Sequence, residues 1–308
     1  MEKNSIFYDE LYHHGIKGQK WGVRNGPPYP LKEGSKSKAE KKQGDLNKQG
    51  FIDPVTATYA TLAVAYLSVI AIKKGAEKVS EMKTNKKLSE ITKSKETKID
   101  EKTGFHLRDS NEPPEEDIKN VNPLWDEGKT KSVSNNCVLC SLAIEMRRRG
   151  YDVIASTESK GLNGLKVTSE AFPGGEPKSV DTYGLFDPES VKNCDLQFAK
   201  NKSLSDYYAA SNNALMGKNT DHAKNVVSTL SKEPNNSRGS IFVQWPFGGG
   251  HAMAYEVKNG TPVIYDGQSG KVYKGSELET LLSKTVAANY YRTDDREFDV
   301  EKLRGRVM

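Results

Sequence analysis

The chain has 308 residues, enough for one sizeable domain with extensions or for two small domains. With 35% hydrophobic and 28% charged residues it is polar for its length, which indicates that part of it does not pack into a core. Its three cysteines, an odd number, do not fit a disulfide framework and suit a reducing compartment. The net charge of +5 reflects lysines that are dense between residues 32 and 103, where we expect a solubilising linker and no nucleic-acid site.

Residues 1–50 carry Gly, Pro, Lys and Ser with few apolar positions, and we expect them to be mostly flexible. We expect no signal peptide, because the segment from Met1 to Tyr12 lacks an apolar run. The stretch from Leu11 to Arg24 reads LYHHGIKGQKWGVR. It resembles a short motif found near the termini of many tailed-phage head and structural proteins, and the motif implies no particular chemistry.

Residues 51–75 predict an apolar helix, because the run from Pro54 to Ile72 has no charge. A membrane span needs about 20 apolar residues, and this run is just long enough, but its threonines and alanines make it only moderately apolar. Contact with a membrane and packing against other subunits of a virion assembly both stay open. Residues 76–116 return to charged and small polar residues and predict a linker, which Pro113 and Pro114 close.

From residue 117 the pattern changes, and we interpret residues 117–308 as one folded domain. The segment from Cys137 to Arg149 predicts a helix with one apolar face, arginines in its last turn and Gly150 as its stop. A helix that precedes antiparallel strands indicates an α+β fold. The further expected elements are strands at 151–155 and 240–245, one or two helices at 203–231, and a hairpin of 253–257 with 262–265.

Cys137 and Cys140 lie in the first turn of the expected helix. A helix N-terminus stabilises a thiolate and offers N–H groups to an oxyanion, so either cysteine is a candidate nucleophile, with Cys137 closer to the helix start. Asn135 and Asn136 are candidates for a helix cap or an oxyanion donor. The C-x-x-C spacing also admits a zinc site or a redox pair, but Cys194 and scattered histidines make a poor second pair of zinc ligands.

His251 follows three glycines and lies between two expected strands, and Asp266 follows the second of the hairpin strands. If the strands pair, the two side chains come close together, and Asp266 orients the imidazole that serves the thiol as base. A structural histidine in a glycine-rich loop is the alternative interpretation.

Four blocks of the chain are similar to the papain-fold toxin domains of the glutamine-deamidase-like group, which occur in polymorphic toxins and phage structural proteins. They begin at Val121, at Asn136, at Gly249 and at Asp266, and their order and spacing fit. The resemblance implies a papain-like fold and a triad of Cys137, His251 and Asp266, and Gln268 matches a polar residue of the family. We expect Cys140 to support the packing of the helix. The family often has proline where Gly267 stands, a difference that we expect to matter little because glycine also turns.

The resemblance implies a cysteine-dependent amidohydrolase, most simply one that deamidates glutamine side chains of a host protein and needs no cofactor or metal. A papain-like protease, including one that cleaves its own linker, and a non-catalytic virion protein stay open as alternatives. We expect the protein in a phage virion, in the host bacterial cytoplasm, or in both. Its other partner, through residues 51–75, is expected to be a virion component or a membrane.

Overall fold

The computed structural model describes residues 54–94, 97–109, 112–125, 131–157 and 162–308. The predicted N-terminal region, residues 1–50 with the phage-type motif, lies outside the described residues. The contacts divide the described chain into two units: the part of helix α3 up to Ser80 belongs to one, and Glu81–Met308 belong to the other.

Helix α3 spans Pro54–Lys93 and is 40 residues long. It therefore continues well past residue 75, where the apolar helix was predicted to end, and it takes up the first part of the predicted linker 76–116. The reason is composition, because the stretch after Gly75 has no proline up to Lys93 and is rich in residues that favour helix. Lys86 and Glu90, 3.9 Å apart, add an exposed pair one helical turn apart. In the part of the chain that the structure describes, no helix has an apolar stretch long enough to cross a membrane.

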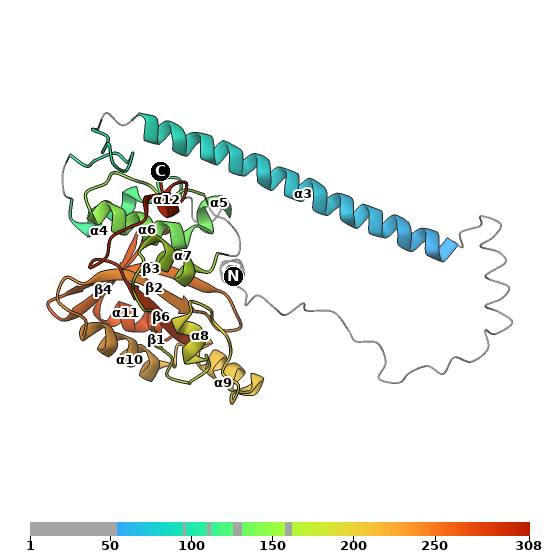
Figure 1. The fold of residues 1–308 in the computed structure, drawn as a ribbon. Helices are drawn as coiled ribbons and strands as arrows, with labels where there is room; N and C mark the ends of the chain where they lie inside the picture. The colour runs from blue at the N-terminus through green and yellow to red at the C-terminus, as the bar shows by residue number, and fades with distance from the viewer. Residues whose placement is uncertain (1–53, 95–96, 110–111, 126–130, 158–161) are drawn as a thin grey trace, which may run out of the picture. The chain divides into compact units, whose positions relative to one another are not determined.

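The second unit is an antiparallel sheet with helices on both faces (Figure 1). Within the described residues the sheet has six strands in the order β1-β6-β2-β3-β4-β5. The strands are β1 (Lys178–Val180), β2 (Arg238–Gln244), β3 (Gly250–Lys258), β4 (Thr261–Asp266), β5 (Lys271–Tyr273) and β6 (Ala287–Arg292). The helices are α4 (Pro114–Asp117), the 3₁₀ turn η2 (Ile118–Asn120), α5 (Lys131–Ser134), α6 (Cys137–Arg148), α7 (Gly164–Ala171), α8 (Pro188–Lys192), α9 (Leu204–Leu215), α10 (Thr220–Ser231), α11 (Gly275–Leu282) and α12 (Val300–Leu303).

Two hydrophobic clusters, one on each face, hold the helices to the sheet. On the first face, α6 and α7 pack over the middle strands, and Ala252 and Ala254 of β3 join their apolar residues. On the second face, α10 and α11 cover the sheet, and Met253, Tyr255 and Val257 of β3 point into that cluster. Small alanines beneath α6 let the helix approach the strand closely, which brings the start of α6 to the beginning of β3.

The sequence predicted much of this architecture, including the α+β class. Helix α6 forms as predicted, α9 and α10 meet at residues 216–219, and β3 and β4 form the predicted hairpin. The predicted strand at Tyr151–Ala155 is wrong, because its residues pair only through isolated bridges of Tyr151 with Leu107 and of Ala155 with Val307. Strand β6, which lies between β1 and β2, was missed.

The packing of this unit reaches upstream of residue 117, the predicted start of the catalytic domain. Phe105 is buried in the first cluster. Asp117 is buried between two guanidinium groups, at 2.8 Å from Arg108 Nη1 and 2.6 Å from Arg147 Nη2. The linker thus supplies a core side chain and one member of a buried charge network that fixes α6.

We therefore expect a fragment of residues 81–308 to be more stable than one of residues 117–308. Loss of a buried phenylalanine costs about 3–5 kcal/mol, and loss of Arg108 leaves Asp117 with one cation fewer. Chemical denaturation followed by circular dichroism measures the difference. Equal midpoints and equal slopes for the two fragments would support the predicted boundary at residue 117.

Candidate active site

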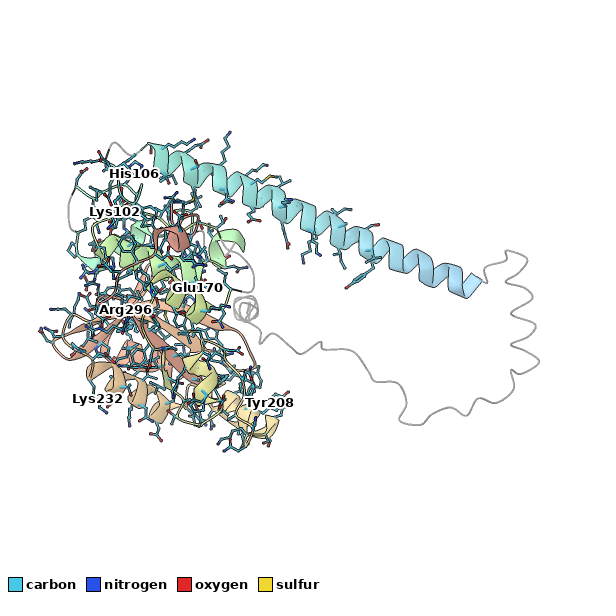
Figure 2. The ribbon with its side chains drawn as sticks, viewed as in Figure 1. Lys102, His106, Glu170, Tyr208, Lys232 and Arg296 are labelled. Carbon is cyan, nitrogen blue, oxygen red and sulfur yellow. The ribbon has the colours of Figure 1, made fainter. Side chains whose placement is uncertain are left out.

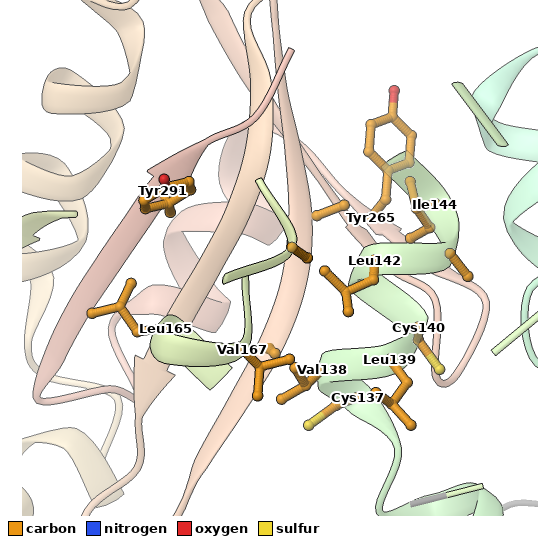
Figure 3. Packing of buried hydrophobic residues seen from close by; sticks show 14 of the residues in the cluster. Cys137, Val138, Leu139, Cys140, Leu142, Ile144, Leu165, Val167, Tyr265 and Tyr291 are labelled. Carbon is orange, nitrogen blue, oxygen red and sulfur yellow. The ribbon is translucent and has the colours of Figure 1, made fainter. Parts of the chain in front are cut away.

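Cys137 is the first residue of α6, and Asn136 occupies the N-cap position. The sequence favours a helix start here because Asn is a common cap residue and an apolar run follows. Figure 3 shows Cys137 at the beginning of α6 and Cys140 one turn further on, with their sulfur atoms pointing in different directions. The thiol of Cys137 thus lies at the positive end of the helix dipole, where negative charge is stabilised.

His251 and Asp266 come from adjacent strands, near the start of β3 and at the end of β4. His251 Nε2 lies 3.1 Å from Asp266 Oδ1. The thiol of Cys137 is a further hydrogen-bond partner of the His251 ring. Because Nε2 faces the carboxylate, Nδ1 is the ring nitrogen left to serve the thiol. The structure thus brings together the three residues that the resemblance implies as a triad.

The electrostatics of the three groups favour the protonated, charged form of His251. Burial lowers the pKa of His251, but the charge of Asp266 and its hydrogen bond, with Cys137 adding to them, raise that pKa well above 6.5. Burial raises the pKa of Asp266, and the opposing charge and hydrogen bond of His251 outweigh it, so the net shift is downward. An imidazolium beside the Cys137 thiol favours the thiolate, which is the nucleophilic form.

Cys140 has the environment of a packing residue. It is fully buried, and its Sγ donates to Asn136 Oδ1 at 3.4 Å. Burial, followed by the charges of Cys137 and Asp266, raises the pKa of the Cys140 thiol well above 9.0. A thiol held neutral in this way is a poor nucleophile at neutral pH.

The predicted support residues form a hydrogen-bond network that the sequence did not indicate. Asn136 does not cap α6 through its side chain; its Nδ2 donates to Ser156 O and to Asn122 Oδ1. Gln268 Nε2 donates to Asn136 Oδ1 at 3.4 Å, and Asn122 Nδ2 donates to Gln268 O at 3.0 Å. These bonds tie the start of α6 to the β4–β5 turn and so fix Cys137 relative to Asp266. Asn135, the other predicted cap or oxyanion residue, is buried beside them.

Two further residues of the β4–β5 turn, Gly267 and Ser269, follow Asp266 closely, and no role in the site was predicted for either. Ser269 Oγ donates to Asp266 Oδ2 at 2.6 Å, on the oxygen that does not face His251. Gly267 is needed for its small size, because a Cβ there would lie 2.8 Å from Ile144 Cδ1 and 3.2 Å from Cys140 Cβ. The expectation that glycine in place of the family's proline matters little stays a prediction, while any larger side chain at position 267 would press on Ile144 and on Cys140 of α6.

We expect Ser269→Ala to lower the rate about tenfold while the fold is kept. A hydrogen bond to a charged group contributes about 1.5 kcal/mol or more, and its loss lets Asp266 turn away from His251. Steady-state rates beside a thermal melt measure this. Thr at position 269 keeps the hydroxyl and serves as the matched control, so a Thr variant as slow as the Ala variant would contradict the role of the hydroxyl.

The ring of Trp245 covers His251. The two rings are stacked with centroids 6.4 Å apart and an interplanar angle of 22°. Trp245 N donates to Gly249 O at 3.1 Å and closes the tight turn that leads from β2 into β3. An aromatic ring roughly parallel to the imidazole adds apolar surface on one side of His251.

The alternative of a zinc site finds no support in the surroundings of the third cysteine. Cys194 Sγ donates to Ser169 Oγ at 3.3 Å, beside α7. Across the described ranges, no three side chains of His, Cys, Asp or Glu gather as metal ligands.

A helix that begins with a cysteine and lies on a sheet carrying a histidine and a carboxylate is the arrangement of papain-like cysteine hydrolases. Comparison with family models agrees: residues 135–271 match the family described as papain fold toxin 1, glutamine deamidase. The match includes Cys137, His251, Asp266 and Gln268. No curated protein and no solved structure matches the chain.

Proposed function

We propose that this protein deamidates glutamine side chains of a host protein, with Cys137 as nucleophile, His251 as acid and base, and Asp266 as the orienting group. The observation that carries the proposal is the thiol–imidazole–carboxylate set at the start of α6, within the segment that matches the deamidase family.

The reaction has two halves. The Cys137 thiolate attacks the side-chain amide carbon of glutamine, and N–H groups at the start of α6 hold the oxyanion. The carbon–nitrogen bond then breaks, His251 gives its proton to the leaving nitrogen, and ammonia departs from a thioester. A water molecule, deprotonated by His251, attacks the thioester carbon; glutamate is formed and the thiol is regenerated.

Burial favours deamidation over peptide cleavage. Cys137 is only 2% exposed and the side chain of His251 only 15%. A single glutamine side chain needs a narrow entrance, whereas a protease must hold an extended peptide on both sides of the scissile bond. Cleavage, including self-cleavage, is the second candidate because it begins with the same attack.

Mass spectrometry of host proteins after expression of the wild-type protein and of Cys137→Ala tests the proposal. We expect a gain of one dalton at glutamine in one host protein, with release of free ammonia and an intact protein band, in the wild-type sample alone. New protein termini without ammonia, absent from the Cys137→Ala sample, would replace deamidation by proteolysis.

We call the unit that begins at Glu81 the catalytic unit. We further propose that residues upstream of it attach the enzyme to a phage particle, from which it reaches the host cytoplasm. Support comes from the motif at 11–24 and from α3, where Tyr66, Leu67 and Ile72 are exposed on an uncharged stretch. Immunoblots of purified particles and of host membranes test this. Presence in membranes and absence from particles would assign the helix to a lipid partner instead.

A further inference from the structure

Exposed apolar side chains gather on one part of the catalytic unit. Between residues 97 and 308, the described chain has six exposed large hydrophobic residues, and five of them lie on α9, at its C-cap or in the β2–β3 turn. Ile99 is the sixth and lies elsewhere. We call the five residues the α9 surface: Leu204, Tyr208, Leu215, Met216 and Phe247.

On α9 the exposed residues follow helical spacing. Leu204, Tyr208 and Leu215 are separated by four and seven residues and therefore share one side of the helix, over about 16 Å of its length. Their exposed fractions are 57%, 40% and 62%. Figure 2 shows Tyr208 at the outside of α9. Of the residues of α9 only Asp206 is charged, so this side of the helix is apolar and almost free of charge.

Phe247 joins this stripe at the cost of an unfavourable backbone conformation. Its φ is 63°, in the left-handed region that favours glycine, yet the residue is a phenylalanine that is 47% exposed. Phe247 N donates to Ser211 Oγ at 3.2 Å, and its ring lies 6.0 Å from that of Tyr208. A strained backbone that presents a ring to solvent points to a role in binding, since nothing in the core needs that ring.

The β2–β3 turn links the α9 surface to the catalytic site along the chain. Trp245 begins this turn and stacks on His251, and Phe247 lies at its tip. His251 is four residues after Phe247, and four residues of chain span at most about 14 Å, so the Cα atoms of the two residues lie within that distance of each other. A protein whose glutamine enters the site therefore brings neighbouring residues onto this surface.

We propose that the α9 surface docks an apolar segment of the protein substrate that lies a few residues from the target glutamine. The inference rests on the proposed deamidation and adds which kind of residues the substrate carries near its target glutamine. Its apolar, nearly uncharged character selects against charged flanks, because a charge placed there would be desolvated without a partner. Binding energy from this contact holds the glutamine at the thiol.

Two synthetic peptides test the proposal with the full-length protein. Each has one glutamine; one carries leucines and phenylalanine four to six residues away, and the other carries serines there. We expect the wild-type protein to prefer the apolar peptide by about tenfold in kcat/KM, measured as ammonia release.

Two variants of the α9 surface should reduce that ratio to about twofold or less. Phe247→Gly removes the ring and keeps a residue that adopts the left-handed backbone easily, and Leu215→Ser replaces an exposed apolar side chain by a polar one. Ile99→Ser, an exposed apolar residue outside the surface, is the matched control and should leave the ratio unchanged.

The outcomes separate the docking inference from the proposed reaction. If the wild-type protein turns over both peptides equally, or if Phe247→Gly and Leu215→Ser keep the preference, docking is refuted and deamidation stands. If neither peptide is deamidated, the proposed reaction fails. Docking is then tested by measuring how tightly the labelled peptides bind to the Cys137→Ala variant, with fluorescence anisotropy as the signal. There a roughly tenfold tighter Kd for the apolar peptide, lost on adding Phe247→Gly, supports docking, and equal Kd values refute it. Variants that alter the oligomeric state while the peptide preference stays would assign the surface to contact between copies and overturn the proposal.

Discussion

Replacing Cys137 by alanine should reduce amide hydrolysis by at least about 10³-fold while the protein stays folded. Removing the nucleophile leaves only binding and oxyanion stabilisation, which act on a reaction that now needs water as the attacking group. The side chain is small and 2% exposed, so its truncation costs little packing. Ammonia release under saturating substrate, beside a thermal melt, measures both effects.

Cys140→Ala is the matched control, since it removes a thiol one turn further along the same helix. We expect it to keep most of the activity and to lose about 1 kcal/mol of stability, because Cys140 is fully buried and packs against the β4–β5 turn. A haloacetamide at neutral pH should label Cys137 and spare Cys140, whose thiol pKa is raised by burial. Labelling of Cys140 with Cys137 unmodified would exchange the two roles.

The parts of the site that the sequence predicts are those set by local structure. Asn136 before an apolar helical run fixes where α6 begins, and hence that Cys137 lies at its first turn. The turn at Asn259 and Gly260 fixes the β3–β4 pairing, and that pairing brings His251 near Asp266. Each inference needs only hydrogen-bond patterns between neighbouring segments.

The parts that the sequence does not reveal depend on contacts between distant segments. Asn122 and Gln268 are 146 positions apart, and no periodicity shows that one amide bonds the other's carbonyl. The same holds for Ser141, whose hydroxyl meets Ser240 beneath α6. Asn136 shows the difference: it occupies the predicted cap position, but its side chain does not bond its own helix and instead donates to Ser156 O and Asn122 Oδ1.

Changing His251 to alanine should abolish activity, and changing Asp266 to asparagine should weaken it less and shift its pH dependence. In the proposed reaction His251 transfers the protons, which contributes about 10²–10⁴-fold, whereas Asp266 orients the ring and favours its charged form without transferring a proton. Losing a hydrogen bond to a charged group costs about 1.5–3 kcal/mol, or about 10- to 100-fold in rate. Full activity in His251→Ala would end the triad proposal.

The pH profile of Asp266→Asn distinguishes an electrostatic role from a merely steric one. The pKa of His251 is raised well above 6.5 by the charge of Asp266 against the effect of burial, so the alkaline limb of kcat/KM, where His251 loses its proton, should move to lower pH in the variant.

The folding stability should depend on pH through the same two groups, His251 and Asp266. The raised pKa of His251 contributes stability that is complete below 6.5 and is lost as the pH rises through the raised value. The lowered pKa of Asp266 contributes stability that is present above 3.8 and is lost as the pH falls through the lowered value. Melting temperatures of the wild type should therefore be highest between these limits, and Asp266→Asn should flatten both flanks. An alkaline limb that stays in place in Asp266→Asn, with a reduced rate, would restrict Asp266 to holding the ring in position.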